Sequence, residues 1–288
     1  MIPARFQYAA VQSVGEAIDR LATLGPDAKI LAGGQSLIPL MKLRLASPRY
    51  LIDVNRIPDL DFIREEDGLL RLGAMVRQAD LETSDLIQRR YPAIADTARV
   101  VADPLVRNLG TIGGNLAHGD PANDHPATML ALGAVLVAQG PAGERTVPAA
   151  EFFTEAFTTA LRHDEMLTEI RVPAPTSSSG SAYLKVERKV GDLATIGVAV
   201  SLTLQDGICA RAGIGLTNAG LMPLRAVQAE EFLRGKPLDD QTIRHAAQLA
   251  MEASDPIADL RGPVEYKRDL VRVITGRALR LALARAQS

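Results

Sequence analysis

Apolar residues recur at two different spacings along the chain, and the change of spacing predicts where helices and strands lie. Residues 14–24 place apolar side chains at helical spacing after a capping box at 13–16, and Gly25-Pro26 would end that helix. The same reasoning predicts strands at 29–32, 50–54, 69–72, 134–138 and 166–172, and helices at 37–45, 76–86, 93–101 and 127–132.

A stretch rich in proline, serine and glycine at 173–180 is the clearest boundary in the chain. Beyond it, strands are predicted at 183–188, 195–204 and 208–217, followed by two or three helices, of which 267–284 is the clearest. This pattern predicts an N-terminal ligand-binding domain, residues 1–176, and a smaller α+β domain, residues 177–288.

Composition narrows the class of protein. The chain has 288 residues, of which 47% are hydrophobic and 23% charged, and its net charge is −2 without a Lys/Arg tract. These values fit a globular protein and argue against nucleic acid or an anionic membrane as the main partner. We find no apolar run long enough for a transmembrane segment and no signal peptide in the first residues, so we expect a cytoplasmic chain, with membrane association through a partner as the alternative.

The single cysteine, Cys209, excludes an internal disulfide. A [2Fe–2S] cluster needs about four cysteine ligands, so this chain cannot hold one alone. Cys209 lies in an alternating stretch, which favours a buried strand thiol over a nucleophile.

Two glycine pairs about eighty residues apart carry the main candidate chemistry. The first motif is Ala32-Gly33-Gly34-Gln35-Ser36-Leu37, after the apolar lead-in Lys29-Ile30-Leu31, and the second is Thr111-Ile112-Gly113-Gly114-Asn115. Consecutive glycines permit positive φ and bring backbone N–H groups close to a ligand, where they form a nest suited to a diphosphate. Ser36 is predicted to cap the next helix and aim its N-terminus at a phosphate. Together the two motifs predict one dinucleotide diphosphate held from both sides.

Other interpretations of these segments stay open. Each glycine pair also fits an ordinary turn, and neither is a Rossmann G-x-G-x-x-G or a P-loop. The second pair falls in a stretch, 102–126, that is predicted to be irregular and is longer than loops without a function usually run. His118, Asp120, Asp124 and His125 fit a metal site poorly because prolines kink the segment. Asp124 fits better as an acceptor for sugar or ribityl hydroxyls, or as a turn-stabilising side chain. No nucleophile–base pair stands out, which favours a cofactor that supplies the chemistry itself.

Both motifs resemble those of the FAD-binding medium subunits of the molybdenum hydroxylases, the family of aerobic carbon monoxide dehydrogenase, quinoline oxidoreductase and xanthine dehydrogenase. The resemblance rests on residues 29–37, Met41-Lys42-Leu43-Arg44 and 107–115, and it continues through 188–192 to 266–268. It implies an α+β fold with a p-cresol-methylhydroxylase-type FAD domain of two α/β subdomains, about 1–57 and 58–176. A C-terminal flavoprotein domain of antiparallel sheet and helices would follow, residues 177–288.

The resemblance also implies which residues contact FAD, which we expect to bind non-covalently. They are Lys29, Ile30, Leu31, Ala32, Gly33, Gly34, Gln35, Ser36, Leu37, Gly110, Thr111, Gly114, Asn115, Ala117, Asp120, Asp124, Leu167 and Lys185. One departure is Leu193, because many relatives carry an aromatic residue there against the flavin ring.

The function implied by the resemblance is electron transfer within a heterotrimer that forms a dimer of heterotrimers. A large partner would hold the molybdenum cofactor and a small partner two [2Fe–2S] clusters, while FAD on this chain would pass electrons to an external acceptor. A stand-alone FAD oxidoreductase of the same fold and a non-catalytic nucleotide-binding assembly subunit are the alternatives.

Overall fold

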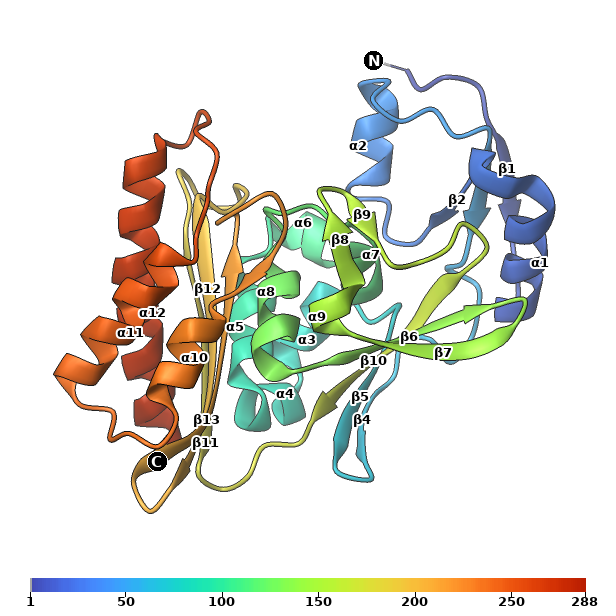
Figure 1. Cartoon of the computed structure of the whole chain (residues 1–288). Helices are drawn as coiled ribbons and strands as arrows, with labels where there is room; N and C mark the ends of the chain where they lie inside the picture. Colours follow the sequence, from blue (N-terminus) through green and yellow to red (C-terminus); the bar gives the residue numbers. More distant parts are fainter. Residues whose placement is uncertain (1) are drawn as a thin grey trace.

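Three units follow one another along the chain, and the computed structural model describes residues 2–288 of it (Figure 1). The first unit is a three-stranded parallel sheet in the order β1-β3-β2 with two helices. Its elements are β1 (Gln7–Ala10), α1 (Val14–Leu24), the short 3₁₀ helix η1 (Gly25–Asp27), β2 (Ala28–Leu31), α2 (Leu37–Lys42) and β3 (Tyr50–Asp53). Helix α1 begins as predicted, because the Ser13 hydroxyl accepts a hydrogen bond from the N–H of Glu16 at 3.1 Å.

The second unit is a five-stranded antiparallel sheet in the order β4-β5-β10-β6-β7, accompanied by helices α3 to α9. Its strands are β4 (Ile63–Glu66), β5 (Leu69–Gly73), β6 (Val135–Gly140), β7 (Gly143–Pro148) and β10 (Met166–Pro173), with a small hairpin of β8 (Phe153–Glu155) and β9 (Thr158–Thr159). Its helices are α3 (Gln78–Thr83), α4 (Asp85–Arg90), α5 (Pro92–Val100), α6 (Pro104–Arg107), α7 (Ile112–His118), α8 (Asp124–Leu132) and α9 (Ala149–Phe152).

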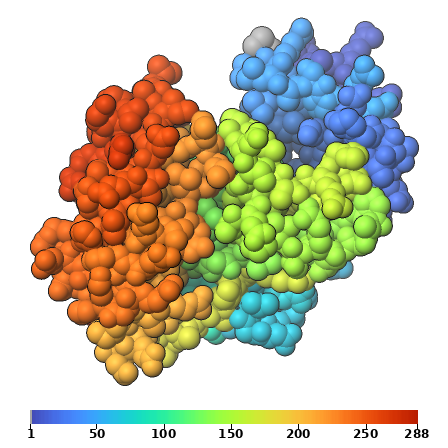
Figure 2. Space-filling view, viewed as in Figure 1, coloured from blue at the N-terminus to red at the C-terminus, as the bar shows by residue number. Residues whose placement is uncertain are grey.

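The third unit is an antiparallel sheet in the order β11-β12-β13-β14, covered by helices on both faces. Its strands are β11 (Ser179–Val186), β12 (Ile196–Gln205), β13 (Ile208–Thr217) and β14 (Leu224–Arg225), and its helices are α10 (Val227–Leu233), α11 (Asp240–Glu252) and α12 (Val264–Ala286). These three helices cover one face, while α5 and α8 of the second unit cover the other (Figure 1). The space-filling view accordingly places the second unit between the first and the C-terminal helices (Figure 2).

Three glycines allow these helices to lie directly on the third sheet. A Cβ at Gly213 or Gly215 of β13 would lie 2.0 Å from a backbone carbonyl oxygen of α8, that of Ala131 or Ala127 respectively. On the opposite face, a Cβ at Gly180 would lie 2.0 Å from the Ala282 carbonyl oxygen of α12. The sheet is therefore held between two helical layers at backbone contact distance.

The predicted pattern of elements is largely confirmed, with informative exceptions. The stretch 102–126 is not irregular: it contains α6, α7 and the start of α8, because Asp103 and Thr111 cap two short helices that the glycines and prolines had hidden. The predicted helix at 76–86 is wrong as a single element, since Ser84 ends α3 and caps α4. The prediction for 37–45 was too long, and β1, β4, β7, β8, β9, β14 and α9 were missed.

The contact between α8 and β13 predicts a steep cost for one added methyl group. We expect Gly215→Ala to lower the free energy of unfolding by about 1–3 kcal/mol, because its Cβ would overlap backbone that no rotamer can move. Gly15→Ala in α1 is the control, since nothing lies closer than 4.0 Å to its Cβ, and it should stabilise slightly. Denaturant unfolding of both variants measures this, and equal stability would contradict the close contact.

Candidate functional site

The two glycine motifs touch each other through their backbones, although they belong to different units of the fold. A Cβ at Gly33 would lie 2.2 Å from the carbonyl oxygen of Leu109 and 2.8 Å from the Cα of Gly110. A Cβ at Gly114 would lie 3.7 Å from that of Ala32. Glycine at 33 is therefore required by the neighbouring backbone, and the motifs predicted to share a ligand do lie side by side.

The first motif presents a run of backbone donors. It is the turn between β2 and α2, and Gly34 turns it at φ 71°. Within residues 2–288, the backbone N–H groups of 33–37 donate to no acceptor of the chain. Successive N–H groups of this kind form an anion-binding concavity. Ser36 makes no capping hydrogen bond, so the predicted role of its side chain as a helix cap is wrong.

The second motif is the first turn of α7 rather than a loop. The Thr111 hydroxyl accepts a hydrogen bond from the N–H of Gly114 at 3.1 Å, while the N–H of Gly113 donates to the Ala74 carbonyl at 2.9 Å. The side-chain amide oxygen of Asn115 is buried without a partner among the residues described. Because an unpaired buried amide oxygen is costly, this atom fits a donor group from a bound ligand.

Asn55 and Arg77 tie the two motifs together, and sequence reasoning missed both. The Arg77 guanidinium donates to the Leu109 carbonyl at 2.5 Å and to the Asn55 side-chain oxygen at 2.7 Å. The Asn55 amide in turn donates to the Ala32 carbonyl at 2.9 Å. No local pattern marks these residues, since their partners lie 22 to 32 positions away.

Asp124 lies in a buried polar network where the second and third units meet. Its carboxylate accepts hydrogen bonds from the Tyr183 hydroxyl at 2.6 Å and the Lys185 ammonium at 3.2 Å, and Lys185 also donates to the Val100 carbonyl at 2.9 Å. Burial raises the pKa of Asp124, and the Lys185 charge opposes that shift. Burial and the Asp124 carboxylate also raise the pKa of Tyr183, another residue that sequence reasoning missed.

Asn123 connects this network to the second motif. Its side-chain amide donates to the Asn115 carbonyl at 2.8 Å, and its own carbonyl accepts a hydrogen bond from Thr217 of β13. Asp124 and Lys185 are thereby joined to α7 through one short chain of hydrogen bonds. Asp120 takes the turn-stabilising role, because its carboxylate accepts from the N–H of Ala122 at 2.9 Å.

The remaining residues that were predicted to contact FAD differ in how far they are buried. Lys29 and Ala117 are exposed, whereas Leu167 is buried on β10 in the core of the second unit. The other residues of the first motif and its lead-in are half-buried: Ile30, Leu31, Gln35 and Leu37. Leu193 is 40% exposed.

The candidate metal residues are dispersed in the structure. The described residues, 2–288, contain no group of three or more His, Cys, Asp or Glu side chains that could hold a metal ion. His118 contacts the Phe157 ring edge-on, and His125 is buried. Cys209 is a buried thiol on β13, as expected. Over the same residues, no helix has both the length and the apolar character that a membrane span requires.

The fold is that of a flavoprotein chain, in which the two glycine turns of the first and second units lie side by side. A family model described as the FAD binding domain in molybdopterin dehydrogenase matches residues 4–175, and one described as the CO dehydrogenase flavoprotein C-terminal domain matches residues 181–282. The chain therefore belongs to the family of FAD-binding medium subunits of the carbon monoxide dehydrogenase-like molybdenum hydroxylases, as the motifs predicted.

Relatives match over the full length of the chain. It is 47% identical to the carbon monoxide dehydrogenase medium chain of Hydrogenophaga pseudoflava over 99% of both chains, and 45% identical to that of Afipia carboxidovorans over 100% of both. Among solved structures, the H. pseudoflava carbon monoxide dehydrogenase that lacks the Mo-pyranopterin moiety has a TM-score of 0.97 at 49% identity, covering 99% of both chains. Quinoline 2-oxidoreductase from Pseudomonas putida 86 has a TM-score of 0.93 at 35% identity, covering 100% of both.

The Asn55–Arg77 link predicts a specific weakening of cofactor binding. We expect Arg77→Gln to raise the Kd for FAD about tenfold, because the two motifs lose the charged bridge that fixes their spacing. Titration of flavin-free chain with FAD, followed by flavin fluorescence, measures this. Arg89→Gln, which removes an exposed guanidinium of α4, is the matched control and should leave the Kd unchanged. A wild-type Kd for Arg77→Gln would show that the bridge is dispensable.

His125 predicts how stability depends on pH. It is fully buried on α8, where its Nε2 donates to the Gln78 side-chain oxygen at 2.5 Å, and burial lowers its pKa to about 3. Between pH 6.5 and 3 the unfolded chain binds a proton at this residue while the folded chain does not, so acid favours unfolding. This residue alone should lower the free energy of unfolding by about 1.4 kcal/mol per pH unit below 6.5.

Urea unfolding at pH 7.5 and 5.5 tests this expectation. His125→Asn should be less stable at pH 7.5 but lose less stability on acidification than the parent chain. His245→Asn, at an exposed position, is the control and should keep the parent's pH dependence. Parallel profiles for His125→Asn and the parent would contradict a neutral buried imidazole.

Proposed function

We propose that this chain is the FAD-carrying electron-transfer subunit of a heterotrimeric molybdenum hydroxylase resembling carbon monoxide dehydrogenase. The proposed partners are a large subunit with the molybdenum cofactor and a small subunit with two [2Fe–2S] clusters, assembled as a dimer of heterotrimers in the cytoplasm. Its support is that the relatives matched over full length are medium chains and subunits of such dehydrogenases.

One observation carries the proposal: five consecutive backbone N–H groups at 33–37 have no acceptor among residues 2–288, and Gly33 lies at contact distance from the second glycine turn. We propose that these donors hold the FAD diphosphate, that Thr111, Gly114 and Asn115 close the site from the other side, and that no covalent bond is formed. The unpaired amide oxygen of Asn115 and the backbone cradle at Gly33 both fit such a ligand. Bound FAD would supply the redox chemistry, taking electrons from partner clusters and passing them to an external acceptor.

The chain's own residues would bind and orient rather than react. In this proposal Asp124 holds the Lys185 ammonium in place through their ion pair, and Lys185, whose side chain is 2% exposed, would contact the cofactor. Gln35, Ala117, Asp120 and Leu167 would complete the surroundings of the cofactor, together with residues 29–31 and 37. The domain division that we propose is 1–176 and 177–288, supported by the change from β10 to the separate sheet that begins with β11.

Turnover by the lone chain tests this function against a stand-alone oxidoreductase. We expect the FAD-loaded chain without partners to reduce no artificial dye with aldehydes, N-heterocycles or carbon monoxide as substrate. The same chain, once its flavin is reduced chemically, should reduce the dye, which shows that the electron exit is intact. Substrate-dependent dye reduction by the lone chain would overturn the proposal, and failure to bind any FAD would favour an assembly subunit.

A further inference from the structure

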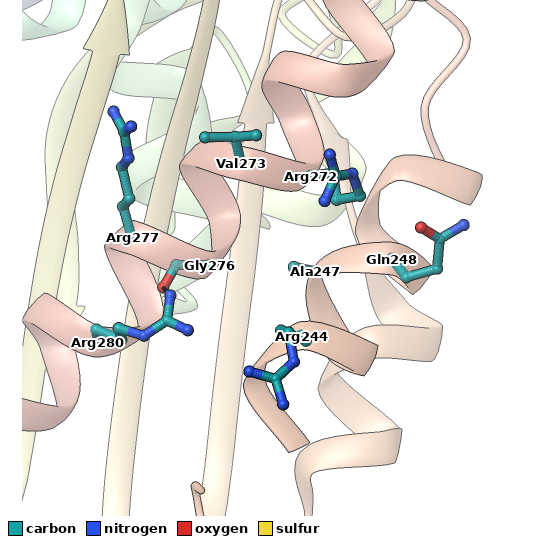
Figure 3. Close-up of a pocket in the computed structure, with 8 residues that line it drawn as sticks. All are labelled: Arg244, Ala247, Gln248, Arg272, Val273, Gly276, Arg277 and Arg280. Carbon is teal, nitrogen blue, oxygen red and sulfur yellow. Dashed lines mark hydrogen bonds between the residues drawn. The ribbon is translucent and has the colours of Figure 1, made fainter. Parts of the chain in front are cut away.

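A groove lined by arginines runs between α11 and α12 on the outer face of the third unit (Figure 3). It has a volume of about 410 Å³. The sheet β11–β14 separates it from α5 and α8, so it is remote from the glycine motifs. The residues that line it are Arg244, Ala247 and Gln248 of α11 and Arg272, Val273, Gly276, Arg277 and Arg280 of α12.

The lining of the groove is positively charged although the whole chain has a net charge of −2. Four of its eight residues are arginines and none is acidic. Arg244 and Arg277 have no carboxylate within 4 Å among residues 2–288. Two of the four guanidiniums that line the groove are therefore not neutralised by an ion pair among these residues.

Two of the arginines are held in place by hydrogen bonds, which include carboxylates outside the lining. The Arg280 guanidinium donates to the Asp240 carboxylate at 2.8 Å and to the Gly276 carbonyl at 3.2 Å. Arg272 pairs with Asp269 at 2.5 Å. Figure 3 shows Arg244 and Arg280 toward one end of the groove, Arg272 and Gln248 toward the other, and the Arg277 side chain pointing away from α11. Fixed guanidiniums lose less freedom when they bind an anion.

The floor of the groove is formed at Gly276, where the surrounding packing would also accept a side chain as small as that of alanine. Gly276 lies in the middle of the 23-residue helix α12, where glycine is unfavourable relative to alanine. A Cβ there would meet its nearest neighbours, Arg280 and Ala247, at 3.5 and 3.8 Å, which is ordinary contact. The glycine therefore relieves no clash, and its consequence is a deeper groove between the helices.

We propose that this groove binds a small molecule with two or more adjacent phosphates. Guanidinium groups bind phosphate oxygens through paired N–H donors, and several of them around one recess favour a ligand with several phosphates over a single one. The volume fits a small-molecule ligand. A recess with arginines on two facing helices suits a compact anion better than the flat surface of a membrane.

Titration calorimetry on the full chain, saturated with FAD so that the glycine motifs are occupied, tests the proposal. The probes are inorganic triphosphate and ADP, compared with phosphate and sulfate at matched ionic strength. Triphosphate should bind at least tenfold more tightly than phosphate, and Arg244→Gln/Arg280→Gln should weaken it at least tenfold, with flavin absorbance unchanged. Equal affinity for triphosphate, phosphate and sulfate would overturn the proposal.

Further variants distinguish specific binding in the groove from nonspecific attraction of anions to the positive charge of the chain. Gly276→Leu should abolish triphosphate binding by filling the floor, whereas Gly276→Ala, whose Cβ meets only ordinary contacts, should weaken binding less and should not lower the thermal midpoint. Arg89→Gln/Arg211→Gln removes the same charge elsewhere and should bind normally; an equal loss in this control would overturn the proposal. Binding to phosphatidylglycerol vesicles without any binding of triphosphate would also overturn it and assign the groove to a membrane surface.

Discussion

The site depends on one close approach, in which the Gly33 backbone lies against the Leu109 carbonyl and Gly110. Only residues without a side chain permit this distance, and a Cβ at 33 would force the two turns apart. Because the first turn leads out of a parallel sheet and the second leads into α7, their contact also joins the first and second units. The packing of these units and the geometry of the proposed cofactor site thus depend on the same backbone contact.

Glycines also set a close backbone contact where the second unit packs on the third. Helix α8 lies on β13 at Gly213 and Gly215, and its first residue is Asp124. The depth at which α8 sits therefore determines where Asp124 meets Tyr183 and Lys185 of β11. A charged pair this well buried needs further hydrogen bonds, and here Lys185 also donates to the Val100 carbonyl while Tyr183 donates to Asp124. The geometry of this polar network therefore depends on Gly213 and Gly215 as well as on the charges of Asp124 and Lys185.

The arginine groove shows how a second charged region can lie on a fold whose main site is elsewhere. Helices α10 to α12 close one face of the third sheet, and the inner sides of α11 and α12 supply its core through residues such as Ile243, Ala246 and Ile274. Their outer sides are free to carry arginines, and Gly276 keeps the helices from filling the space between them. The same helix pair therefore stabilises the domain and forms a separate surface.

The sequence by itself determined the family, the flavin chemistry and the location of both glycine motifs, because these reside in local signals: turns, caps and residues without side chains. It also determined most helices and strands, since alternation and helical spacing are short-range patterns. It did not identify Asn55, Arg77 or Tyr183, because their hydrogen-bond partners lie far along the chain. It also missed helix α7, because the glycine pair in its first turn is unfavourable for a helix. Only the tertiary structure decided which polar groups meet, because such contacts are set by how whole units pack rather than by any neighbouring residue.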